Sequence, residues 1–175
     1  MTKKNFLRMI RHRAARVAVG ASAVRGQGAS GIGKRARDFF CGLQLAPFAT
    51  SDQRQFTRAL NGATRRLMRV LPTRASSWGL SRKLLNIFLR DSLYVVYLRE
   101  AYGLGAAEKL LEIPLDSITA GRIRQRVPEL SRWRGVKHVE PDLSSAYQAA
   151  ALTIAKREGI ARVHLDAFWW GAQER

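Results

Sequence analysis

Two residues of this sequence, a lysine and an aspartate, have side chains that could take part in a chemical reaction. Lys83 lies in an apolar stretch, residues 78–91, "WGLSRKLLNIFLRD". On a helix, Leu80 and Ile87 would share its face. This spacing alone is typical of a surface lysine whose aliphatic stem lies on packed side chains while its ammonium stays in water. An amine held neutral in a pocket would instead be a nucleophile that can form a Schiff base with a carbonyl carbon.

Asp116 follows 33 positions later, in "EIPLDSITAGRI", residues 112–123. It comes directly after Pro114 and Leu115 and opens a segment with helical character. We therefore expect it to be an N-cap, because a carboxylate there accepts an unpaired backbone N–H and favours the positive end of the helix. This structural role would explain the aspartate without any catalytic function, so both interpretations stay open on the residues alone.

Taken together, the two segments resemble the helix-hairpin-helix DNA glycosylase/AP-lyase superfamily. The family pattern G-x-x-R-K-x-x-N, whose lysine is the nucleophile, is similar to residues 79–86, "GLSRKLLN". The family's V-D-T-H turn, which carries the catalytic aspartate, resembles the "PLDSI" of residues 114–118, and Arg122 stands at the arginine-bearing helix position. The Lys83–Asp116 spacing and the "IPLD" turn look closest to the archaeal 8-oxoguanine glycosylases.

This resemblance implies a metal-free and cofactor-free DNA repair enzyme that removes a damaged base, with 8-oxoguanine as the best guess, and then cuts the abasic strand. Lys83 would be the Schiff-base nucleophile, and Asp116 would stabilise the positive charge that develops on the sugar. The amine must be neutral to attack, and burial or nearby cations such as Arg82 would lower its pKa. The alternative is a non-catalytic nucleic-acid-binding module on a similar helical scaffold.

The sequence also departs from the family pattern. The usual glycine–hydrophobic–glycine hairpin is replaced by "SSWGLSR", residues 76–82, with a single glycine, and Ser117 and Ile118 replace threonine and histidine. The cysteines that bind a cluster in one branch are absent, and the N-terminal part is short. These departures affect two features that the resemblance implies. One is phosphate binding by the N–H groups of the hairpin, and the other is the shape of the base pocket.

Several basic and aromatic residues are candidates for contacts with DNA. A positively charged side chain pairs with a phosphate, and an aromatic ring stacks on a base. We expect nucleic-acid contacts from Trp78, Gly79, Arg82, Arg122, Arg132, Trp133, Arg134 and Lys137, and further phosphate contacts from Arg65, Arg66, Arg69 and Arg74. The candidates for a base pocket are Phe88, Trp169 and Trp170, although a place in the hydrophobic core explains each of these three equally well.

The charge of the whole chain favours a polyanionic partner. Its 175 residues include 31 Lys and Arg but 13 Asp and Glu, a formal net charge of +18. Such an excess predicts binding to nucleic acid or, less often, to an anionic membrane surface. The first acidic residue is Asp38, and ten basic residues precede it. Residues 1–30 therefore predict a basic arm with a glycine-rich linker, which would also suit an organelle import signal.

Helical periodicity dominates the rest of the chain. We expect helices over about residues 34–43, 52–71, 79–104, 117–127, 142–157 and 161–173, with a basic loop at 131–141. No strong strand pattern occurs. The sequence thus predicts an all-α protein, with a compact glycosylase-like domain over 31–175 that contains a helix-hairpin-helix-like element.

Cysteine content and hydropathy favour an intracellular protein in the cytoplasm or nucleoid. The single cysteine, Cys41, excludes an intramolecular disulfide and a four-cysteine metal site. The histidines show no metal-binding spacing, and no run of about 18 apolar residues occurs. We therefore expect a monomer that binds duplex DNA and does not enter a membrane.

Overall fold

The computed structural model describes residues 2–171, with side chains described as far as Trp169, and the regular secondary structure of this part of the chain is all helical, without a strand. The all-α prediction is therefore confirmed. The helices are α1 (Lys3–Ala18), α2 (Ala21–Val24), α3 (Ile32–Gly42), α4 (Gln53–Val70), α5 (Trp78–Tyr94), α6 (Val96–Tyr102), α7 (Ser117–Arg126), α8 (Pro141–Arg157) and α9 (Leu165–Gly171). Short 3-10 turns connect them: η1 (Ala46–Phe48), η2 (Thr73–Ala75), η3 (Leu104–Ala107), η4 (Val136–His138) and η5 (Arg162–His164).

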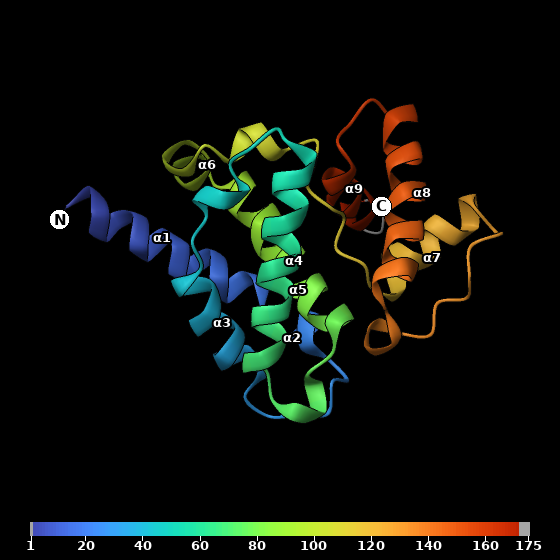
Figure 1. Cartoon of the computed structure of the whole chain (residues 1–175), viewed down its shortest axis with the longest axis horizontal. Coiled ribbons are helices and arrows are strands. Elements are labelled where there is room, and N and C mark those ends of the chain that lie inside the picture. The colour runs from blue at the N-terminus through green and yellow to red at the C-terminus, as the bar shows by residue number, and fades with distance from the viewer. Residues whose placement is uncertain (1, 172–175) are drawn as a thin grey trace.

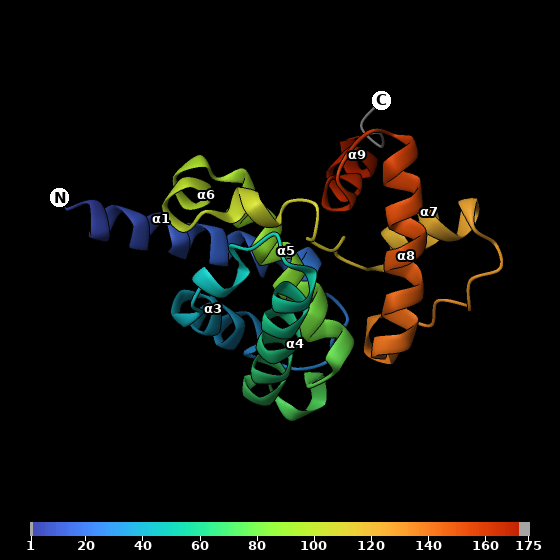
Figure 2. The same cartoon turned by 45° about the horizontal axis from the view of Figure 1, so that its top comes forward.

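The helices form two groups, and each has its own hydrophobic cluster. The first cluster gathers the buried side chains of α1 to α6 and η3. The second gathers those of α7, α8 and α9, with Ile113 and Leu115 from the segment that joins the groups. Figures 1 and 2 show this segment as the link between α6 and α7, with α1 to α6 on one side and α7 to α9 on the other.

Helix α5 is the centre of the first group. It is apolar on most of its circumference, and Leu80, Leu84, Leu85 and Phe88 are fully buried. Its N-cap is Ser77, whose hydroxyl accepts the backbone N–H of Leu80. Such a helix can be covered by neighbours on several sides, and α1, α4 and α6 all pack against it. Polar residues on α5 are therefore held in defined surroundings.

The sequence left open whether residues 79–104 form one helix or break. They break at Val95, whose backbone is extended, so that α5 ends at Tyr94 and α6 begins at Val96. Two adjacent β-branched valines at this point lower the helix propensity locally. The break turns α6 back towards α1, where the rings of Phe6 and Tyr97 meet edge to face at 5.0 Å.

The structure does not confirm a flexible N-terminal arm. Helix α1 packs against α3 and α5, and Ala14, Ala15 and Ala18 are buried in that contact. Alanine side chains are small enough to let helix backbones approach closely, although they give only a weak hydrophobic signal in a sequence. The guanidinium of Arg11 adds hydrogen bonds to the carbonyl oxygens of Phe40 and Leu43.

Candidate active site

A pocket of about 790 Å³ lies where the two helical groups meet. Its walls come from the end of α1, the α2 segment, one face of α5, the start of α7 and the start of α9. On α5 the lining residues are Lys83, Ile87, Arg90, Asp91 and Tyr94, whose spacing places them on one side of the helix. Both candidate catalytic residues, Lys83 and Asp116, line this pocket.

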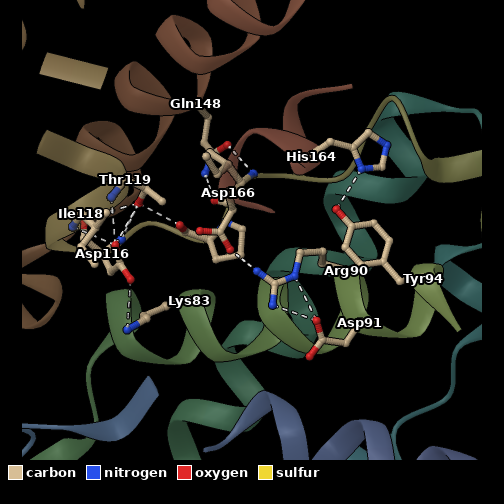
Figure 3. Close-up of polar contacts among 12 residues, drawn as sticks. Lys83, Arg90, Asp91, Tyr94, Asp116, Ile118, Thr119, Gln148, His164 and Asp166 are labelled. Carbon is tan, nitrogen blue, oxygen red and sulfur yellow. Dashed lines mark hydrogen bonds and ion pairs between the residues drawn. The ribbon is translucent and has the colours of Figure 1, made fainter. Parts of the chain in front are cut away.

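Lys83 is almost completely buried, with 8% of its surface exposed. Its Nζ atom lies 3.8 Å from Oδ2 of Asp116 (Figure 3). It also donates a hydrogen bond of 3.2 Å to the carbonyl oxygen of Ala23. Burial lowers the pKa of Lys83, and the charges of Asp116 and Asp166 oppose this effect without reversing it. The amine is therefore not the snorkelling surface group that its spacing alone suggests.

Asp116 is the N-cap of α7, as its position in the sequence predicts. Its Oδ1 atom accepts the backbone N–H groups of Ile118 and Thr119 at 2.9 and 3.0 Å, and the hydroxyl of Thr119 accepts the backbone N–H of Asp116 at 2.8 Å. This reciprocal capping fixes the carboxylate. The second oxygen, Oδ2, is the one that faces Lys83, so capping and pairing use different oxygens of one group.

A second carboxylate in the pocket, Asp166 on α9, was missed by sequence reasoning. It is 4% exposed and forms an ion pair with Arg90, which also pairs with Asp91 at 2.8 Å. Burial raises the pKa of Asp166 to about 6, with Arg90 acting in the opposite direction and Asp116 adding to the rise. Its only signal in the sequence is a lone acidic residue within the apolar run of residues 163–170.

The segment predicted to be a linker also contributes to the pocket wall. Gln27 is 9% exposed, its Nε2 donates to the carbonyl oxygen of Arg25, and its Oε1 has no hydrogen-bond partner among the described residues. A buried amide oxygen without a partner is unfavourable, and Gln27 is one of the residues that line the pocket.

Arg82, predicted to contact nucleic acid, points into the protein interior. It is 7% exposed and makes two hydrogen bonds to the carboxylate of Glu112, at 2.8 and 2.9 Å. It also donates to Asn61 and Thr64. Burial raises the pKa of Glu112, but Arg82 outweighs this and holds it below its ordinary value. This arginine therefore ties α5 to α4 and to the link between the helical groups.

Gly79, also predicted to contact nucleic acid, is covered by η4. A Cβ atom at this position would lie 2.1 Å from the carbonyl oxygen of Val136 and 2.7 Å from Cβ of Val139. The absence of a side chain thus allows residues 136–139 to rest directly on the start of α5. The left-handed glycines of the described chain all lie outside residues 71–79, so the α4–α5 connection lacks a glycine hairpin turn.

The loop before α8 lies beside the pocket. Gly135 and Val136 line the pocket, and the neighbouring Arg132, Arg134 and Lys137 are exposed, as their predicted role in nucleic-acid binding requires. Trp133 is half-buried, and its Nε1 donates to Ser117 Oγ at 3.3 Å. Two further candidates, Trp78 and Arg122, are also half-buried, and the guanidinium of Arg82 lies 5.1 Å from the centre of the Trp78 ring.

Phe88 and Trp169, two of the three aromatic residues suggested for a base pocket, do not line the pocket. Phe88 is fully buried and stacks on Phe40 in the core, with ring centres 4.5 Å apart. Trp169 is 2% exposed in the second cluster, and Arg126 lies over its ring. The side chain of Trp170 falls outside the described residues. The two described rings pack in the hydrophobic interior, where their large apolar surfaces are removed from water.

Two kinds of structural feature are absent from the described part of the chain. No group of three or more His, Cys, Asp and Glu side chains there is placed to hold a metal ion. No helix in residues 2–171 has the length and apolar character needed to cross a bilayer.

Fold and site together define an all-helical protein in which a buried lysine faces a half-buried aspartate in a pocket between two helical groups. Comparison of the chain with protein-family models, curated proteins and solved structures gives no match. A proposal about function therefore depends on the geometry of the pocket and on the residues that line it.

Proposed function

We propose that this protein is a DNA glycosylase with AP-lyase activity that acts through a Schiff base on Lys83. The observation that carries the proposal is the buried amine of Lys83, 3.8 Å from the carboxylate of Asp116, in a pocket of about 790 Å³. The protein would act as a monomer on duplex DNA that holds a damaged or abasic nucleotide, in the cytoplasm or nucleoid. The α4–α5 pair would take the place of the helix-hairpin-helix element.

The chemistry needs a neutral amine at the anomeric carbon of the sugar. The nitrogen lone pair of Lys83 would attack C1′, the C1′–N bond would break, and the base would leave with the bonding electrons and take up a proton. Ring opening then gives an imine between Lys83 and C1′. Because burial lowers the pKa of Lys83, a larger fraction of the amine is neutral near pH 7 than for an exposed lysine.

Asp116 would stabilise positive charge on the sugar as the bond to the base breaks. Its Oδ1 atom is held by two backbone N–H groups, so the carboxylate cannot turn away from Lys83. A fixed negative charge aimed at a developing positive one requires no reorganisation during the reaction, which makes it effective in a water-poor site. At 3.8 Å from Nζ, the same carboxylate could receive a proton from the amine through one bridging water.

The remaining pocket wall offers hydrogen-bond acceptors to a base. Asp166 and Gln27 are among the residues that line the pocket, and the buried Oε1 of Gln27 has no hydrogen-bond partner among the described residues. Acceptors of this kind suit a base that presents several N–H groups on one edge, as guanine and 8-oxoguanine do. This supports an oxidised purine as the best candidate substrate.

Borohydride trapping tests the proposal. The protein is incubated with duplex oligonucleotides that carry 8-oxoguanine, uracil or an abasic site, borohydride is added, and covalent adducts are separated on a denaturing gel. An adduct is expected with the abasic duplex and with one of the lesions. Lys83→Gln should abolish it, whereas Lys109→Gln, which removes an exposed lysine, should leave it unchanged.

The variant Asp116→Asn separates the two functions of the aspartate. Asparagine is a good N-cap, so α7 and the fold should persist while the rate of adduct formation falls about 100-fold or more. Absence of an adduct with every substrate, from protein that still binds DNA, would refute the lyase and favour a non-catalytic nucleic-acid-binding module. Strand cleavage that survives in Lys83→Gln would likewise exclude Lys83 as the nucleophile.

A further inference from the structure

Helix α4 carries a row of exposed arginines on the side that faces solvent. Its sequence contains no acidic residue. At about 100° per residue, Arg54, Arg58, Arg65 and Arg69 fall within an arc of about 60°. All four are exposed, while the opposite face of the helix, with Phe56, Leu60, Ala63 and Leu67, is buried in the core. The four arginines, called the arginine row below, extend over about 22 Å.

The charges of the arginine row are not neutralised within the described part of the protein. None of its four side chains forms an ion pair or a hydrogen bond with a described residue. The nearest acidic residue along the chain, Asp52, precedes the helix and is engaged in capping it. Four like charges on one helix face repel each other, since pairs three or four residues apart are close together. An anionic partner would relieve this repulsion.

The arginine row lies on a different side of α5 from the pocket. Lys83, Ile87 and Tyr94 of α5 face the pocket, whereas Arg82 reaches from α5 to Asn61 and Thr64 of α4. Successive helix residues project about 100° apart, so α4 packs on another face of α5 than the one that forms the pocket. The arginine row then points away from both α5 and the pocket.

The residue types favour a phosphodiester backbone over a membrane surface. All basic residues of α4 are arginines, and a planar guanidinium binds phosphate oxygens through two parallel hydrogen bonds. A groove of about 300 Å³ runs beside the row, lined among others by Arg58, Arg66, Gln44 and Gln55. A helix that binds membranes would expose apolar side chains beside its charges, but the apolar residues of α4 from Phe56 to Leu67 face the core.

We propose that the arginine row of α4 is a second nucleic-acid-binding surface, separate from the Lys83 pocket, that holds the phosphate backbone of a double-stranded segment. This inference does not depend on the glycosylase activity, since it follows from the charge and exposure of α4. A row of about 22 Å matches the length of six or seven base pairs along the axis of a duplex, at about 3.4 Å each. The surface would bind without sequence preference and would keep the protein on nucleic acid.

A salt titration with charge-matched variants tests this surface. One variant carries Arg54→Gln, Arg58→Gln, Arg65→Gln and Arg69→Gln. The control carries Lys4→Gln, Arg13→Gln, Lys109→Gln and Lys156→Gln, four exposed cations on three other parts of the fold. Affinity for an undamaged 30-base-pair DNA duplex is measured by fluorescence anisotropy over a series of sodium chloride concentrations, with duplex RNA and anionic phospholipid vesicles as parallel probes.

In the arginine-row variant, the negative slope of log affinity against log salt should become shallower by about three to four. Each lost phosphate contact reduces the magnitude of this slope by about 0.9. The control should change the slope by about one or less. An unchanged slope in the arginine-row variant, or an equal loss in both variants, would overturn the proposal. Loss of vesicle binding with duplex binding intact would assign the row to a membrane instead.

The same variants keep this inference separate from the proposed glycosylase activity. The duplex probe is undamaged, so its binding does not require the chemistry of Lys83. Borohydride trapping of an abasic duplex at saturating DNA and low salt should be equal in the arginine-row variant and the parent protein. If the parent protein forms no covalent adduct, the proposed lyase activity is refuted, whereas the proposal for the arginine row still stands.

Discussion

At the scale of single residues, the amine of Lys83 is under two opposing influences. Burial favours its neutral form, while the negative charges of Asp116 and Asp166 favour the ammonium. Asp116 is in near contact, whereas Asp166 lies beyond ion-pair distance of Lys83 and is paired with Arg90. The protonation of the lysine therefore responds to a residue that does not touch it.

Replacing Asp166 by asparagine should shift the pH dependence of imine formation. The ionised carboxylate raises the pKa of Lys83, so removing its charge lowers that pKa and keeps the amine neutral to lower pH. The acidic limb of the rate of adduct formation should move towards lower pH. The rate is measured from pH 5 to 9 on an abasic duplex, so that recognition of a base is not involved. A shift towards higher pH would contradict this electrostatic role.

The two central residues of the site could be predicted, and the two others could not. The pairing of Lys83 with Asp116 was expected from the resemblance of their two segments to the glycosylase family, because the spacing around Lys83 alone is typical of a surface lysine. Asp166 is a single acidic residue in an apolar run, and Gln27 stands in a glycine-rich segment typical of a linker. Their contribution depends on how the chain ends fold back onto α5, which no local pattern in the sequence encodes.

At the scale of elements, the contact between α5 and η4 closes the pocket on one side. This contact depends on Gly79, because Val136 and Val139 occupy the space where a side chain would be. The obstacle at 2.1 Å is a backbone carbonyl oxygen, which cannot rotate away as a flexible side chain would. Residues 135–139 must therefore move if this position gains a methyl group.

The variant Gly79→Ala should lose stability by about 1–3 kcal/mol, as expected for an added group in a filled interior. Gly121→Ala on α7 is the matched control, since a Cβ atom there meets nothing within 4 Å. In a helix interior this change should raise stability by about 0.5–1 kcal/mol. Both values come from urea unfolding followed by circular dichroism. Equal stabilities of the two variants would mean that η4 is not held against α5.

Most long helices were predictable, because their ends carry local signals. Asp52 and Pro72 mark the ends of α4, and Asp116 and Pro128 those of α7, within one or two residues. The packing of α1 and α2 was not predictable. The buried residues of α1 are alanines, whose contribution comes from small size rather than from hydrophobicity, and the glycine content around α2 is typical of a flexible linker.

At the scale of the whole molecule, the net charge of +18 has opposite consequences for folding and for binding. The ion pairs of the described chain involve few of the 31 basic residues. The remaining cations repel one another in the compact state, and salt screens this repulsion. Binding to a polyanion weakens with salt, since it is accompanied by counterion release.

Raising sodium chloride from 20 to 300 mM should therefore increase the melting temperature, by about 2–4 °C for a gain of about 1 kcal/mol. Differential scanning fluorimetry of the free protein measures this shift. The affinity for DNA should fall over the same range. A melting temperature that decreases with salt would mean that the few buried ion pairs, such as Arg82 with Glu112, outweigh the surface repulsion.

The wall of the pocket built from residues 17–27 has a practical consequence for anyone who shortens this protein. By composition, the first 31 residues look like the natural place to trim before crystallisation or to attach a fusion partner. Trimming them would remove the carbonyl oxygen of Ala23 that accepts from Lys83 and open the amine to water. The lysine of such a shortened protein would behave as an ordinary charged lysine, so a shortened protein would not test the activity proposed for Lys83.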